Sequence, residues 1–183
     1  MPAEFDAVAT TEPYYRSTYV LAYAKGRGID VSSGAEFLAL DRGKLAKLKI
    51  GVYDRSPAVR WLTKNGLIDQ AVPYQMLSPD PSHYPGQIID RELASGRIDA
   101  AVIWGPIAGY FASRVRDAEI MIVPLKSEPG VRFDYAMAMG VRHGEPQWRA
   151  RVQAALDAGR ERIDAVLREY GVPLIDEAGE PLQ

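Results

Sequence analysis

The chain has 183 residues, of which 47% are hydrophobic, and this combination predicts one globular domain or two small lobes rather than a disordered segment. The 22 basic and 24 acidic residues are well mixed, and the net charge of -2 argues against nucleic acid or an anionic membrane as the main partner. The absence of cysteine excludes thiol catalysis, disulfides and cysteine-based metal sites.

Membrane and targeting segments are not visible in the sequence. No apolar run approaches the roughly 20 residues that a membrane helix needs. The first residues, Met1 to Glu4, show neither the basic start nor the apolar core of a signal peptide, although a processed start would look the same. The residues themselves therefore leave the compartment open.

The first predicted element is a long strand over residues 17–25, within the stretch EPYYRSTYVLAYAKG. Tyrosine and valine favour strands, and Lys25 and Gly26 close the run. Both faces are apolar, since Tyr19, Leu21 and Tyr23 alternate with Val20, Ala22 and Ala24. We therefore expect other elements to cover this strand on both sides.

Strands and helices then alternate through the middle of the chain. The expected strands are residues 48–53, 71–77, 97–104 and 118–125, and the expected helices are residues 56–66, 85–96 and 105–115. Pro57 and Pro106 stand at first helical positions, after Ser56 as a predicted N-cap in the first case, and Gly66 stops the first helix. This βαβαβαβ pattern predicts an α/β lobe over residues 28–126 with a mostly parallel sheet.

A second long strand, residues 132–142, follows the lobe. Two helices, at about residues 146–158 and 160–170, and a solvated tail complete the chain. Two long strands that bracket a lobe suggest a double hinge. The predicted organisation is therefore α/β: residues 1–27 as a remnant of a first lobe with one hinge strand, residues 28–126 as a complete lobe, and residues 127–183 as the return strand and helices of the first lobe.

Four stretches of this sequence resemble one known family. They are TTEPYYRSTYVLAYAKG, SGRIDAAVIWGPIAGYF, FDYAMAMGVRHGE and IDAVLREYGVPLI. Together they are similar to the crossover strand, late strand and helix, returning hinge strand and closing helix of family 3 periplasmic solute-binding proteins. The sequences TTEPYYRSTYV, WGPIAGYF and YGVP resemble those of the XoxJ/MoxJ branch, whose members are encoded beside pyrroloquinoline-quinone (PQQ) methanol dehydrogenases.

The resemblance implies a type II periplasmic binding protein-like fold with one complete lobe, the C-terminal part of the second lobe and two hinge strands. It also implies that a half-lobe preceding the crossover strand is missing here, so that exposed apolar surface could drive self-association. The implied function is that of a non-enzymatic periplasmic accessory factor, without a cofactor, whose protein partner is a quinoprotein methanol dehydrogenase. The alternative is a transporter receptor for a small apolar or anionic solute.

Two strand-to-helix junctions are candidate ligand sites. Tyr53, Asp54, Arg55 and Ser56 form the first junction, and Trp104 and Gly105 form the second. In open α/β sheets ligands bind at the carboxyl ends of strands, and free N–H groups at helix starts suit anions. Ordinary helix capping and core packing are the competing interpretations.

Tyrosines are the other candidates. Tyr14, Tyr15, Tyr19 and Tyr110 could line a cleft or a protein interface, since tyrosine suits both, or they could form an aromatic cluster between strand and core. By the family resemblance, amino-acid-binding members carry an acidic residue near the end of the DAAVIWG strand, where Trp104 and Gly105 stand here. We therefore expect an aromatic cleft that binds amino acids poorly.

The sequence offers little support for a catalytic site or a metal site. The two histidines, His83 and His143, are far apart in polar turns, so a zinc site is not expected. No nucleophile-elbow, zinc-protease or phosphate-loop motif is present. A dehydratase on this fold would need converging acid and base groups, and a LysR-type sensing domain would need a DNA-binding helix-turn-helix upstream.

Overall fold

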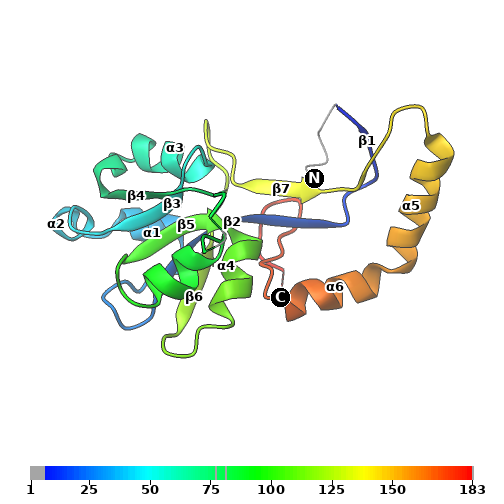
Figure 1. The fold of residues 1–183 in the computed structure, drawn as a ribbon. Helices are drawn as coiled ribbons and strands as arrows, with labels where there is room; N and C mark the ends of the chain where they lie inside the picture. The colour runs from blue at the N-terminus through cyan, green and yellow to red at the C-terminus, as the bar shows by residue number, and fades with distance from the viewer. Residues whose placement is uncertain (1–6, 77, 81, 183) are drawn as a thin grey trace.

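The computed structural model describes residues 7–76, 78–80 and 82–182, so residues 1–6 of the predicted first-lobe remnant, Leu77 at the end of a predicted strand, and Gln183 lie outside the described residues. The main sheet has the order β4-β3-β5-β2-β6 (Figure 1). These strands are β2 (Tyr15–Ala24), β3 (Ile50–Tyr53), β4 (Ala71–Tyr74), β5 (Ala100–Trp104) and β6 (Ile120–Pro124).

The sequence predicted that two long strands flank the α/β lobe, and the position of β2 in the sheet differs from that prediction. β3 pairs in parallel with β4 and β5, as expected, but β2 lies between β5 and β6 and is antiparallel to both. The registers Tyr19↔Trp104 and Val20↔Pro124 place the second half of β2 in the middle of the sheet. Its two apolar faces fit this central position, because each face meets a layer of helices.

The alternation along β2 divides the core into two layers. Tyr19, Leu21 and Tyr23 belong to one cluster, which packs under α1 (Gly34–Leu38) and α3 (Pro57–Lys64). Val20 and Ala22 belong to the opposite cluster, which packs under α4 (Gly105–Ala112) and the π-helix η2 (Ile88–Leu93). The strand is therefore covered on both sides, as its sequence predicted.

The helices of the lobe follow the capping signals only in part. α3 ends where predicted: Gly66 has φ +67°, and the N–H of buried Leu67 donates to the Leu62 carbonyl at 2.8 Å. The helix expected over residues 85–96 is shorter and is a π-helix. α1, α2 (Arg42–Leu45) and the 3₁₀ turn η1 (Ile68–Gln70) were not predicted, because they are shorter than the periodicity that identifies a helix.

The two hinge segments lie side by side. β7 (Asp134–Met137) pairs antiparallel with the first half of β2, from Tyr15↔Met137 to Thr18↔Asp134. The predicted single strand over residues 132–142 is wrong in detail, because strand pairing is interrupted around Pro13, between β1 and β2. Proline has no N–H to donate, and pairing resumes as β8 (Gly140–Val141) with β1 (Ala9–Thr10).

The two C-terminal helices form where predicted, as α5 (Pro146–Ala158) and α6 (Arg160–Glu169). Figure 1 shows α5 beside β1, at the end of the molecule opposite α1, α2 and α3, and α6 running back toward α4. Among their described residues only Leu156 is buried, and Trp148 is 50% exposed. These helices therefore contribute little to the core.

None of the described residues of the predicted solvated tail, 176–182, is buried, and this tail forms a hydrogen-bonded turn. Leu174 and Ile175 just before it are buried, and the backbone N–H groups of Ala178 and Glu180 both donate to the Asp176 carboxylate at 2.8 Å. Glu180 also pairs with Lys126 of the lobe, at 2.6 Å. Asp176 accepts hydrogen bonds from the backbone of the turn that follows it, and such a turn has no hydrophobic periodicity by which it could be predicted.

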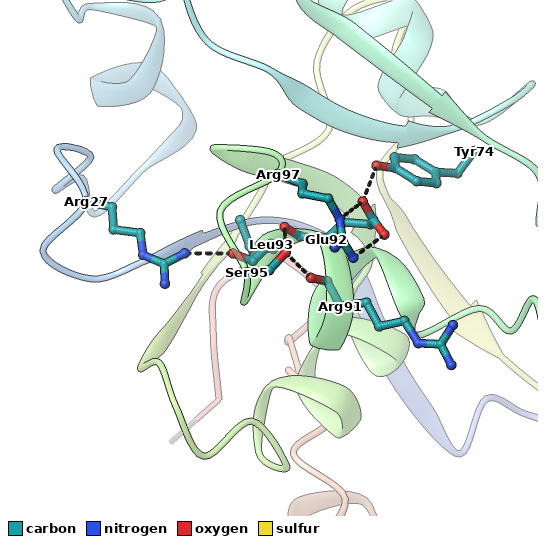
Figure 2. A network of polar contacts seen from close by, with 7 residues as sticks. All are labelled: Arg27, Tyr74, Arg91, Glu92, Leu93, Ser95 and Arg97. Carbon is teal, nitrogen blue, oxygen red and sulfur yellow. Dashed lines mark hydrogen bonds and ion pairs between the residues drawn. The ribbon is translucent and has the colours of Figure 1, made fainter.

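A polar network fixes η2 on the face of the sheet that it shares with α4 (Figure 2). Arg97 donates to both carboxylate oxygens of Glu92, at 2.8 and 2.9 Å, and Tyr74 donates to the same group at 3.4 Å. The Arg97 hydrogen bonds hold the pKa of Glu92 below its usual value. Arg27 donates to the carbonyls of Leu93 and Ala94, so the loop after β2 satisfies the end of η2.

Candidate functional site

An aromatic cluster lies where β2, β5 and β7 meet. The Tyr19 ring is 5.6 Å from Trp104 and 5.7 Å from Phe133, and Trp104 makes an edge contact with Tyr135 at 5.7 Å. Burial, with a smaller contribution from Tyr135, raises the pKa of Tyr19 to about 12. Tyr19 therefore stays neutral at physiological pH and serves as packing, with Trp104 at the edge of the cluster.

A groove of about 510 Å³ runs along α4 and the end of α6. We call it the apolar groove, because every residue that lines it is apolar or aromatic: Pro85, Trp104, Pro106, Ile107, Tyr110, Phe111, Val166, Leu167, Tyr170 and Val172. Tyr110 and Tyr170 stack across it with ring centroids 5.3 Å apart. The Arg114 guanidinium covers the Tyr110 ring at 3.6 Å and marks one edge.

Two glycines of α4 bring the walls of the apolar groove together. A Cβ on Gly105 would lie 2.4 Å from the Thr18 carbonyl, and one on Gly109 would lie 1.8 Å from the Gly171 carbonyl. Only glycine allows this backbone approach. The segment that follows α6 is thereby held against α4, and the aromatic rings of both helices face one groove.

A second groove, of about 830 Å³, lies beside α3. We call it the basic groove. It is lined by Arg55, Ser56, Pro57, Val59, Arg60, Thr63, Lys64, Gly130, Val131, Arg132 and Tyr135. Four of these side chains are cationic, and none is acidic. The groove therefore carries a local positive charge on a chain whose net charge is -2.

Ser56 stands at the start of α3, as predicted, but its side chain makes no capping hydrogen bond. Its Oγ is buried and, within the described residues, has no hydrogen-bond partner. Arg55 before it has φ +60°, the left-handed region that a non-glycine residue rarely adopts. Among the described residues, the junction thus leaves the Ser56 hydroxyl without a protein partner.

The predicted site residues do not converge on one surface. Arg55 and Ser56 line the basic groove, and Trp104 and Tyr110 line the apolar groove. Tyr14 and Tyr15, whose rings meet at 5.1 Å, line a third groove of about 440 Å³ beside Arg16 and Asp164. Burial raises the pKa of Tyr14 and of Tyr15, for which the neighbouring Tyr14 adds a smaller effect.

The other predicted residues line none of these three surfaces. Tyr53 is 1% exposed, its hydroxyl donates to the Pro85 carbonyl, and burial raises its pKa. Gly105 is buried against the Thr18 carbonyl, Tyr19 packs inside the aromatic cluster, and Asp54 is exposed with its backbone N–H bonded to the Tyr74 carbonyl. Tyr53 and Gly105 therefore support the site from beneath.

Sequence reasoning missed several groove residues. Arg60, Arg132, Tyr135 and Tyr170 line the grooves without having been singled out. The sequence did contain a signal for Tyr135, because strand alternation puts its side chain on the same face as that of Phe133, among other large side chains. No sequence pattern predicted the basic groove as a whole, since Arg132 lies in a loop far along the chain from α3.

Metal and membrane features are absent from the part of the chain that the structure describes. No group of three or more histidine, aspartate or glutamate side chains is placed to hold a metal ion among these residues. His83 pairs with Asp80 at 3.2 Å in an exposed turn. None of the described helices has the length and apolar character that crossing a membrane requires.

Comparison with known proteins identifies close structural relatives, although no family model matches the sequence. The periplasmic binding protein XoxJ from Methylobacterium extorquens AM1 is 32% identical, with a TM-score of 0.74 over 92% of this chain and 74% of XoxJ. MxaJ from Methlophaga aminisulfidivorans MPT is 23% identical, with a TM-score of 0.77 over 96% of this chain and 74% of MxaJ.

The curated relatives carry a related name. Protein MoxJ of Methylorubrum extorquens is 27% identical over 96% of this chain. Protein MoxJ of Paracoccus denitrificans is 26% identical over 93% of this chain. The chain spans 61% and 64%, respectively, of the length of these two relatives.

Proposed function

This chain belongs to the XoxJ/MoxJ family of periplasmic binding proteins, with their type II binding-protein fold, and on that premise we propose that it is a periplasmic accessory factor of a PQQ-dependent methanol dehydrogenase. In this role it binds a segment of the enzyme and carries out no reaction itself. The whole chain, including the hinge strands and the C-terminal helices, serves to hold the binding surface.

The single observation that carries this proposal is the chemistry of the apolar groove. No charged side chain lines it in the described part of the chain, and the only charge that we place at its edge is the cation Arg114, so a free amino acid would bury its ammonium there without an acidic partner. An unpaired buried charge is costly. An apolar face of a helix or loop meets no such penalty, and helix-in-groove recognition uses this kind of surface.

The aromatic lining supports the same occupant. Trp104, Tyr110 and Tyr170 present large, rigid faces with few rotamers to freeze on binding, and tyrosine and tryptophan are enriched among interface residues that dominate affinity. The close approach of Gly109 to Gly171 holds these rings in place before a partner arrives. Such preorganisation lowers the entropy cost of association.

The experiment is a calorimetric titration of the chain with cofactor-free methanol dehydrogenase, followed by alanine substitution in the groove. We expect Tyr110→Ala and Tyr170→Ala each to weaken binding by about 2 kcal/mol, or roughly thirtyfold. Trp148→Ala is the matched control, since Trp148 is an exposed aromatic residue on α5 that does not line the apolar groove.

Equal losses for the control and the groove variants would mean that the apolar groove is not the contact surface. In that case the dehydrogenase, if bound at all, would use another face of the chain. Unchanged binding in Tyr110→Ala and Tyr170→Ala would contradict the proposal in the same way.

A second candidate function is that of a solute receptor for a small anion, and the Ser56 junction is the observation that favours it. The buried Ser56 Oγ without a partner and the start of α3 both offer groups that an anion could satisfy. Thermal-shift screening separates the two candidates. A clear shift with a small carboxylate at micromolar concentration would favour the receptor, because only a tightly bound ligand stabilises at that concentration.

A further inference from the structure

We propose that the basic groove is a docking surface for an acidic segment of the protein partner. This inference rests on the proposed function and specifies the chemistry of the partner: a stretch rich in aspartate or glutamate next to an apolar anchor. The observations are Arg55 and Arg60, two exposed cations that form no ion pair among the described residues, the spacing of the cations along α3, and the aromatic contact between the two grooves.

Two of the four cations of the basic groove, Arg55 and Arg60, are free to take an acidic partner. Within the described residues neither Arg55 nor Arg60 forms an ion pair, and both side chains are exposed. Lys64 differs, because it pairs with Glu128 at 3.3 Å and donates to the Pro129 carbonyl at 3.0 Å. Arg132 lies over the Tyr135 ring at 5.0 Å and donates to the Asp134 carbonyl. The groove thus offers guanidinium groups that suit bidentate carboxylate binding.

The spacing of these cations favours a polypeptide over a small anion. Arg60 and Lys64 are one helical turn apart, and the stretch from Ser56 to Lys64 spans about 12 Å at the helical rise per residue. A single small carboxylate can reach only part of such a row. An extended segment of about four residues matches this length, since extended chain advances about 3.3 Å per residue.

The two grooves meet at one aromatic contact. Trp104 lines the apolar groove, Tyr135 lines the basic groove, and their rings make an edge contact with centroids 5.7 Å apart. Because α3 and α4 cover opposite faces of the sheet, a partner segment that occupies both grooves has to pass the strand ends where Trp104 and Tyr135 meet. Acidic residues of the partner in the basic groove would lie next to Arg55, Arg60 and Arg132.

The electrostatic contribution has a defined dependence on salt. Exposed charges more than about 10 Å apart are screened at 0.1 M ionic strength, and close pairs between exposed groups are weakened as well. We therefore expect the basic groove to affect association mainly at low salt, and charge reversal to slow the approach of the partner. The apolar groove should show little dependence on salt.

The test uses fluorescein-labelled hexaglutamate as a probe of the basic groove, independent of any dehydrogenase. At low salt we expect saturable binding that is weakened about tenfold by Arg55→Glu/Arg60→Glu and abolished at 0.5 M salt. Arg116→Glu is the matched control, because Arg116 is exposed in the loop after α4 and lines neither groove. This control should change binding by less than about twofold.

Three outcomes decide the inference. Hexaglutamate binding that is lost in the double variant and kept in the control supports it. Absent binding, or binding that Arg55→Glu/Arg60→Glu leaves intact, overturns it. Citrate that binds more tightly than hexaglutamate and displaces it also overturns it, in favour of a small-anion site.

The same variants separate this inference from the proposed function. If cofactor-free dehydrogenase binds the wild-type chain and Arg55→Glu/Arg60→Glu with equal affinity and equal dependence on salt, the accessory role stands and the basic groove is not its docking surface. If the dehydrogenase never binds while hexaglutamate does, the proposed function fails and the groove binds acidic segments of some other partner.

Discussion

Replacing Gly109 by alanine is expected to destabilise the chain, although the same change in an ordinary helix stabilises it. In an exposed helix, alanine gains about 1 kcal/mol over glycine. Here the new Cβ would lie 1.8 Å from the Gly171 carbonyl oxygen and 2.7 Å from its carbon, and both belong to backbone. To restore a 3.0 Å contact, α4 and the segment after α6 must separate by about 1 Å, and such overpacking typically costs about 1–3 kcal/mol.

The expected net result is a loss of up to about 2 kcal/mol, or a fall in melting temperature of up to about 8 °C for a chain of this size. Thermal and urea unfolding followed by circular dichroism measure both. Gly43→Ala is the control, since its Cβ would meet only the side-chain oxygen of Asp41, at 3.1 Å. A Gly109→Ala variant at least as stable as wild type would refute the close contact between α4 and Gly171, and with it the preorganised apolar groove.

Two further changes test the support beneath the grooves. Arg97→Gln should lower the free energy of unfolding at pH 7 by up to about 1 kcal/mol, because it removes both hydrogen bonds to Glu92. The pKa of Glu92 is lowered in the folded chain, so this contribution is fully present above the usual value of 4.5 and is lost as pH falls through the lowered value. The urea midpoints of variant and wild type should therefore approach each other as the pH is lowered from 4.5, and a gap that does not narrow would contradict the ion pair. Thr18→Val should cost about 1–3 kcal/mol, because the Leu125 carbonyl loses a buried donor at 2.6 Å; an unchanged melting temperature would exclude that bond as a link between β2 and β6.

Local signals predicted much of the secondary structure. The double alternation along β2 and the proline and glycine around α3 each act within a few residues, so the sequence displays them directly. The direction of β2 in the sheet could not be read in this way. It depends on pairing with residues such as Trp104 and Pro124, which lie about a hundred positions further along the chain.

The candidate site shows the same division. Trp104 was identified because a strand end followed by a helix start is a local pattern, and Tyr110 was identified as a tyrosine suited to line a cleft; both line the apolar groove. Tyr53 satisfied the same pattern but is buried, because the alternation of β3 turns its side chain into the layer beneath α4. The opposite wall of the groove, with Tyr170, depends on how α6 meets α4, and no short stretch of sequence reports that contact.

Calorimetric titration of the chain with cofactor-free methanol dehydrogenase at several temperatures, at physiological salt, tests the central claim most directly. Binding in an apolar groove predicts saturable association with a negative heat-capacity change, the thermodynamic marker of apolar surface leaving water. The same titration with free amino acids should give no binding heat. Tight binding of an amino acid, together with no association with the dehydrogenase, would contradict the account and identify the chain as a solute receptor.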